Sequence, residues 1–198
     1  MVGVVKKRGS LSDSYRAAWS EIKAAKMFIW IIVGIFVLSG IFGFVQWESL
    51  TAFDEILRAL VAQVEGMGAW ELTWFIFQNN VTSALLGLVF GVAFGIFPVI
   101  NALTNGAVLG YVLRLTANIS GVQEFWRLLP HGIFELPAIF ISLGLGLRLG
   151  GFAFAGKGLR WKMLKERLGK ALWVFVLVVL PLLLVAAVIE GILISAGV

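Results

Sequence analysis

The sequence predicts an all-α integral membrane protein, a polytopic helical bundle with about five transmembrane helices plus amphipathic interfacial helices. Of its 198 residues, 60% are hydrophobic and 14% are charged, and the mean hydropathy is +0.98. A soluble domain is typically about 45–50% apolar and about 25% charged. Several uncharged runs are also long enough to cross about 30 Å of hydrocarbon. The basic residues gather in segments between these runs, as in multi-spanning proteins.

The predicted elements form one integral membrane domain, residues 1–198. Residues 1–26 are polar and basic, and 12–26 predicts a short amphipathic helix on the membrane surface, because Tyr15, Trp19 and Ile22 recur at helical spacing. Residues 47–71 are acidic with an apolar stripe, which predicts a second interfacial helix on the other side. The spans are expected at about 27–46, 72–98, 101–118, 130–149 and 171–195.

The distribution of basic residues predicts the orientation of these spans. Thirteen of the 16 Lys and Arg residues lie before or at the start of the first span, or between the end of the fourth span and the fifth. With five spans these regions share a side, so the positive-inside rule places the N-terminus in the cytoplasm and the C-terminus outside. The net charge of +5 then faces anionic lipid headgroups. No nucleic-acid partner is expected.

Small residues spaced four apart predict close helix packing. Gly87, Gly91 and Gly95 form such a ridge on the second span, and Gly106 and Gly110 continue one on the third. Residues four apart share a helix face, and small residues let helix backbones approach closely in lipid. We expect the second and third spans to pack together. The alternative is that one ridge forms the interface of a homodimer or small homo-oligomer.

Polar residues at membrane depth predict one outward-facing cavity. Six of them fall in the outer half of the predicted spans: Asn79, Asn80, Arg114, His131, Glu135 and Glu190. Such groups usually face a protein interior or a wet cavity. Arg114 is expected to pair with Glu135 or Glu190, since an unpaired buried charge is costly.

The pair His131 and Glu135 leaves three roles open. The two are four residues apart and share a helix face. They can join helices, form a binding or proton-relay site, or hold a divalent metal. Two ligands from one helix do not complete a zinc site, which needs three protein ligands. No cofactor is predicted, and metal is the weakest alternative.

Enzymatic signatures are absent from the sequence. There is no cysteine and one histidine, which excludes thiolate chemistry and a multi-histidine metal site within one chain. No nucleotide-binding loop, catalytic-serine elbow or HExxH pattern occurs. No catalytic residue is assigned.

The segment 129–150, LPHGIFELPAIFISLGLGLRLG, resembles the signature of the stage II sporulation protein M family. The matching positions are Pro130, His131, Gly132, Glu135, Pro137 and Arg148. The resemblance implies a multi-pass protein of a prokaryotic cell membrane. It also implies a non-enzymatic scaffold that recruits membrane or cell-wall proteins. A small transporter or ion-coupled permease using the polar cavity is the alternative, and a metal-dependent intramembrane hydrolase is the second alternative.

Overall fold

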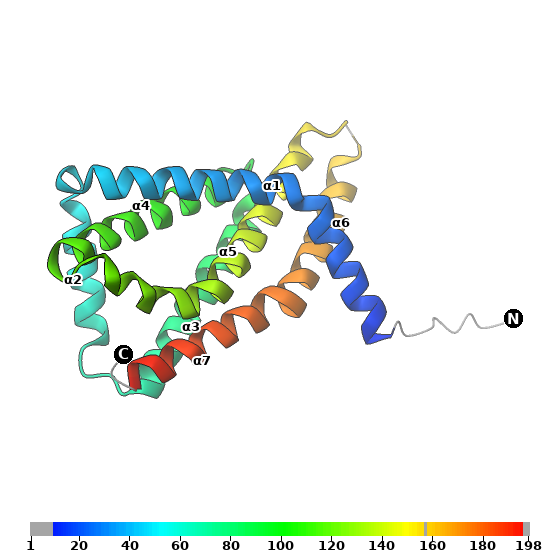
Figure 1. Cartoon of the computed structure of the whole chain (residues 1–198). Coiled ribbons are helices and arrows are strands. Elements are labelled where there is room, and N and C mark those ends of the chain that lie inside the picture. Colours follow the sequence, from blue (N-terminus) through cyan, green and yellow to red (C-terminus); the bar gives the residue numbers. More distant parts are fainter. Residues whose placement is uncertain (1–9, 157, 196–198) are drawn as a thin grey trace, which may run out of the picture.

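The computed structural model describes residues 10–156 and 158–195, and the side chains of residues 126–131, 194 and 195 lie outside the described part. Within these residues there is no strand, and five helical segments are long and apolar enough to cross a membrane. The predicted all-α polytopic bundle is therefore confirmed. Its α-helices are α1 (Leu11–Val45), α2 (Ala52–Val64), α3 (Ala69–Val89), α4 (Ile96–Ile119), α5 (Leu129–Gly150), α6 (Arg160–Val174) and α7 (Leu180–Ser195) (Figure 1).

Helix α1 differs from the expected arrangement at its start. The side chain of Ser10 and the acidic Asp13 form a capping box that begins the helix. The helix then runs without a break to Val45, although its first turns lie at an angle to the rest (Figure 1). The helix predicted at 12–26 is therefore the first part of α1, and its residues Ala18 and Ala25 are buried against the bundle. The placement of this segment on the membrane surface stays a prediction.

Helix α5 lies among α1, α3 and α7 and packs against all of them. Its glycines allow this approach: a side chain on Gly144 would meet the backbone of Ile29 on α1, and one on Gly146 would meet the carbonyl of Gly87 on α3. The hydroxyl of Ser142 adds a hydrogen bond of 2.8 Å to the carbonyl of Ala84. Close backbone contact thus holds α5 to both neighbours.

The expected pairing of the second and third spans is not what the structure shows. The glycines of the second span face α5, where Gly87 lies against Leu143 and Gly91 against the carbonyl of Gly146. The glycines of the third span face α1, where Gly106 lies against Phe36. The sequence contains a third small-residue surface, on α5, and spacing alone does not select which two surfaces meet.

The predicted second span is also too long. Helix α3 ends at Val89, a short 3₁₀ turn η2 (Phe90–Val92) follows, and the chain reverses at Phe94 and Gly95. Both residues have positive φ, 56° and 73°, a conformation that glycine adopts freely and phenylalanine rarely. Helix α4 then begins at Ile96, five residues before the expected start.

The C-terminal span is one long rod that the short π-helical segment η5 (Phe175–Val179) divides into α6 and α7. Helix α6 starts in the basic part of the chain, and α7 ends at the opposite end of the bundle from the start of α1 (Figure 1). A chain that crosses the bundle an odd number of times begins and ends on opposite sides, which agrees with the positions of the start of α1 and the end of α7. The orientation of the bundle relative to the cell stays a prediction.

Helix α2 lies across the end of the bundle opposite the start of α1 (Figure 1). The hydroxyl of Tyr111 on α4 donates a 2.6 Å hydrogen bond to Asp54, and the ring of Phe53 packs edge-on against the same tyrosine at 5.7 Å. None of the α2 residues is buried, and Ile56 and Val61 are 49% and 63% exposed. The helix is therefore attached to α4 mainly near its first turn.

Candidate functional site: an acidic hollow and a buried ion pair at opposite ends

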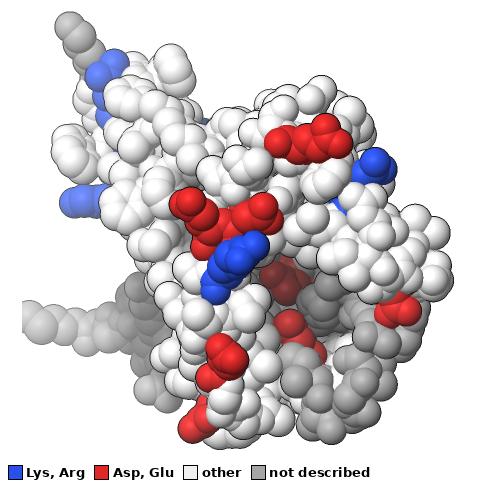
Figure 2. Space-filling view, turned by 90° about the vertical axis from the view of Figure 1, so that its left-hand side faces the viewer, with Lys and Arg blue, Asp and Glu red and all other residues white. Residues whose placement is uncertain are grey.

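The end of the bundle that carries α2 is acidic and hollowed. Figure 2 shows Asp and Glu side chains across this face and others inside a recess beside it. The acidic segment 47–71 contributes Glu48, Asp54, Glu55, Glu65 and Glu71. We call this face the acidic end, and the opposite end, where α1 and α6 begin, the basic end.

Two acidic residues lie on helices of the bundle that pack against each other, Glu135 on α5 and Glu190 on α7. Glu135 is half-buried. At about 1.5 Å per residue, Glu135 lies roughly 9 Å along α5 from its first residue. Helix α5 continues through Pro137, whose missing N–H leaves one backbone carbonyl of the preceding turn without its helical donor. Two carboxylates and polar backbone therefore lie on these two packed helices.

Arg114 does not form the expected ion pair. Its guanidinium lies over the ring of Phe44 on α1, at 5.3 Å from the ring centroid. Its Nε is buried and has no hydrogen-bond partner among the described atoms. No ion pair joins it to Glu135 in the part of the chain that the structure describes. A cation–π contact replaces the predicted charge pair.

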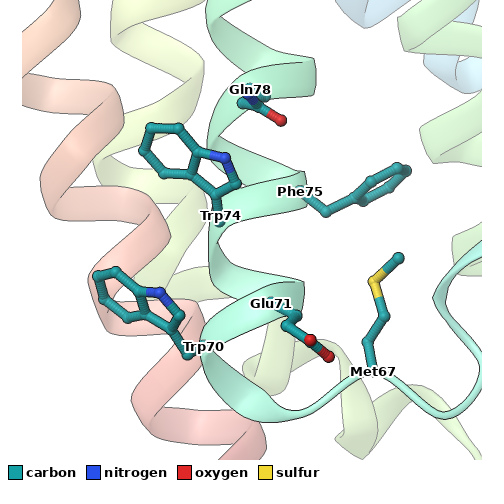
Figure 3. Close-up of a pocket in the computed structure, with 6 residues that line it drawn as sticks. All are labelled: Met67, Trp70, Glu71, Trp74, Phe75 and Gln78. Carbon is teal, nitrogen blue, oxygen red and sulfur yellow. The ribbon is translucent and has the colours of Figure 1, made fainter.

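The asparagines of α3 belong to a different surface. Asn79 is exposed and lies in a groove with Trp74 and Gln78, and Asn80 is half-buried. A neighbouring open groove of about 460 Å³ covers the first turns of α3. Figure 3 shows its lining: Trp70 and Trp74 project to one side of the helix, and Met67 and Phe75 project to the other. Of the six predicted polar residues, Glu135 and Glu190 lie on two helices that pack against each other, α5 and α7.

The remaining predicted site residues lie outside the described side chains. These are Pro130 and His131, so the role of the His131–Glu135 pair stays a prediction. Among the described residues there is no group of three potential metal ligands. The metal alternative for His131 and Glu135 is checked by elemental analysis of the purified protein after metal supplementation.

An ion-pair network at the basic end was missed in the sequence. The guanidinium of Arg148 on α5 contacts the carboxylate of Glu21, a buried residue of α1. Lys170 on α6 approaches the other oxygen of Glu21 at 4.0 Å, and Arg167 donates a 2.9 Å hydrogen bond to the carbonyl of Arg148. The spacing of Ala18, Glu21, Ile22 and Ala25 on one helix face was the available signal. Arg148, one of the positions that match the family signature, is therefore engaged inside the bundle.

Asn101 and Asn105 on α4 form a small amide network. Asn101 donates to the hydroxyl of Ser83 on α3 at 3.0 Å, and Asn105 donates to the Asn101 side chain at 3.0 Å. The network joins α3 to α4 near their shared turn.

Comparison with known proteins gives a family match. A family model described as Stage II sporulation protein M matches residues 24–193. An uncharacterized protein of Methanocaldococcus jannaschii is 31% identical over 121 residues, an alignment that spans 58% of this chain and 64% of that protein. The match therefore covers less than two thirds of the relative's length. No solved structure matches the chain.

Proposed function

Because this chain belongs to the stage II sporulation protein M family, we propose that it is a multi-pass protein of a prokaryotic cell membrane that acts as a non-enzymatic scaffold. In this proposal the bundle is a rigid support, and its acidic end presents surfaces to membrane or cell-wall proteins on the outer side. The basic end faces the anionic headgroups of the cytoplasmic leaflet. Neither a cofactor nor a nucleic acid is part of the proposal.

The observation that carries the proposal is the use of the family signature for packing. The described residues of 132–150 include Ala138 and Ser142, both fully buried, and Gly146, whose backbone meets that of α3. Arg148 of the same segment is taken up by its contact with Glu21. The residues of 138–150 therefore mainly build the bundle, which supports a scaffold role.

Helix α2 supplies the surface that a partner protein would contact. Its apolar residues Ile56, Leu60 and Val61 are 49%, 41% and 63% exposed. Apolar side chains exposed on one helix face commonly mark interaction sites. Acidic residues Asp54 and Glu55 lie on the same helix, so a partner with basic residues around an apolar patch fits this surface best.

The test is capture of interacting proteins from native membranes with a tagged chain. The unchanged chain and His131→Ala are expected to retain the same partners, because the proposal does not use the histidine chemically. A variant with Ile56, Leu60 and Val61 all changed to Ser should lose them, and Gln63→Ser on the same helix serves as the control. Failure to capture any specific partner with the unchanged chain would remove the main support for a scaffold.

A small transporter or ion-coupled permease is the second candidate, and the placement of Glu135 and Glu190 on the packed helices α5 and α7 favours it. Carboxylates inside a membrane bundle commonly mark ion or proton pathways. Reconstituted liposomes should then show substrate-dependent flux that Glu135→Gln abolishes, whereas Glu55→Gln, on exposed α2, leaves it unchanged. Equal flux in both variants, or no flux across a broad substrate panel, would exclude this candidate.

These two experiments distinguish the scaffold proposal from the transporter candidate. Partner capture does not depend on the charge of Glu135, and liposome flux does not depend on partner proteins. Glu135→Gln therefore should leave captured partners unchanged if the scaffold proposal is correct. It should abolish flux if the transporter candidate is correct.

A further inference from the structure

The basic end contains more positive charge than its acidic groups balance. Arg148 and Lys170 approach a single buried carboxylate, that of Glu21, and Arg167 lies beside them with a hydrogen bond to the backbone carbonyl of Arg148. The charges of the two arginines act on each other. Three cations around one carboxylate leave a local excess of positive charge, which an additional anion would stabilise.

A cleft of about 210 Å³ opens beside this cluster, between α1 and α6. Its lining combines small residues with polar and aromatic groups: Ala17, Ala18, Ser20, Glu21, Lys170 and Trp173. The contact with Arg148 occupies one oxygen of Glu21. Lys170 lies at the longer distance of 4.0 Å from the other oxygen, and its side chain is 64% exposed. Its ammonium group therefore keeps donors available to a ligand in the cleft.

Exposed tryptophans place this cleft at the level of a membrane interface. Trp173 in the cleft is 48% exposed, and Trp19, which lies between the cleft residues Ala18 and Ser20 on α1, is 57% exposed. Tryptophan gathers where the hydrocarbon meets the headgroups. Lys23 lies over the ring of Trp19, at 5.7 Å from its centroid, which adds a further cation at the same level.

The other charged groups nearby do not cancel the excess. On α1, Asp13 lies 3.9 Å from Arg16, and both are exposed. On α6, Glu166 is exposed beside the basic residues Lys162 and Lys165. The carboxylates at this end are thus either paired or solvent-exposed, and the cleft stays positive.

We propose that the cleft between α1 and α6 is a specific binding site for the phosphate group of an acidic membrane lipid. Lys170 contacts the phosphate, Ser20 donates a hydrogen bond to it, and the glycerol and upper acyl chains lie against Trp173. Arg148 keeps Glu21 neutralised, so that its carboxylate does not repel the ligand. A charged surface alone would attract any anionic lipid. This cleft has defined walls, one of them aromatic, so it selects one headgroup. The inference stands apart from the scaffold proposal.

The experiment titrates the detergent-purified chain with phosphatidylglycerol and, separately, with phosphatidylcholine, and counts bound lipid by native mass spectrometry. Saturable binding of phosphatidylglycerol at one site, clearly tighter than that of phosphatidylcholine, is expected. Lys170→Gln should weaken it about fivefold, since one basic residue near an acidic lipid surface contributes about 1 kcal/mol. Lys162→Gln, an exposed lysine of the same helix that does not line the cleft, should change it less than twofold.

Three outcomes would overturn the proposal. Equal weakening by Lys170→Gln and Lys162→Gln would show diffuse electrostatics. Equal affinity for the two lipids would show no headgroup preference. Competition by an equimolar amount of inorganic phosphate would assign the site to a free anion instead of a lipid. Both lysines are exposed, so matching unfolding curves for the two variants are expected and are measured first.

Discussion

Replacing Arg148 with Met removes the cation that contacts the buried carboxylate of Glu21 and leaves that carboxylate between α1 and α5. Removing one partner of a buried ion pair typically costs about 3–5 kcal/mol. Lys170 offsets part of this loss from 4.0 Å, a separation worth about 4 kcal/mol at an effective dielectric constant of 20. Its side chain is 64% exposed, so solvent screening reduces that compensation to about 1 kcal/mol. We therefore expect Arg148→Met to lower the free energy of unfolding by about 2–4 kcal/mol.

The assay is denaturation in mixed micelles followed by tryptophan fluorescence. Arg16→Met is the matched control, because its partner Asp13 lies at 3.9 Å but the two side chains are 81% and 60% exposed. It should change the free energy of unfolding little. Glu21→Gln should also destabilise, since it leaves Arg148 without its counter-charge. The double variant Glu21→Gln with Arg148→Met should cost clearly less than the sum of the single changes. An additive result, or an Arg148→Met variant as stable as the control, would refute the buried-pair interpretation.

Three further predictions follow from the packing and the topology. Gly91→Ala should lower the free energy of unfolding by about 1–3 kcal/mol in the same micelle assay, because the added methyl group meets the backbone of α5. Gly34→Ala, with no atom within 4 Å of the new methyl group, should be neutral or slightly stabilising; equal losses would contradict the packing contact. Tyr111→Phe removes the hydrogen bond to α2, so hydrogen exchange in α2 should speed up while α4 stays protected; unchanged exchange would mean that another contact holds α2. Cysteines introduced separately at Leu60 and Lys165 should react with an impermeant reagent from opposite sides of the membrane, and same-side labelling would contradict five spans.

The number of spans was predictable because span length and hydropathy are local properties of the sequence. The end of α3 was not, because residues 90–95 are as apolar as a continuing helix. The reversal there depends on the positive φ of Phe94 and Gly95, which hydropathy does not record. Turn geometry, in this case, overrides a hydrophobic pattern.

Pairing between distant elements was the least predictable part of the bundle. Glycine spacing identified surfaces that allow close contact, but it did not show which of them meet. The bundle has three small-residue surfaces, and Gly91 packs on α5 whereas Gly106 packs on α1. Glu21 was missed for a related reason: its partner Arg148 is 127 residues away. Among the predicted polar residues, Glu135 and Glu190 lie on helices that pack against each other, α5 and α7. Arg114 was assigned the wrong partner because an aromatic ring is as available to it as a carboxylate.

The position of α5 also constrains how the protein is made. Membrane helices first insert and then associate, and chains fold broadly from the N-terminus during synthesis. The surfaces that α5 contacts on α1 and α3 therefore reach the bilayer before α5 exists. Until α5 arrives, the glycine face of α3 contacts lipid, and Glu21 lacks the arginine that later neutralises it. Assembly thus has an ordered later stage, in which the fourth crossing completes contacts that earlier crossings have left open before the fifth crossing packs against α3 and α5.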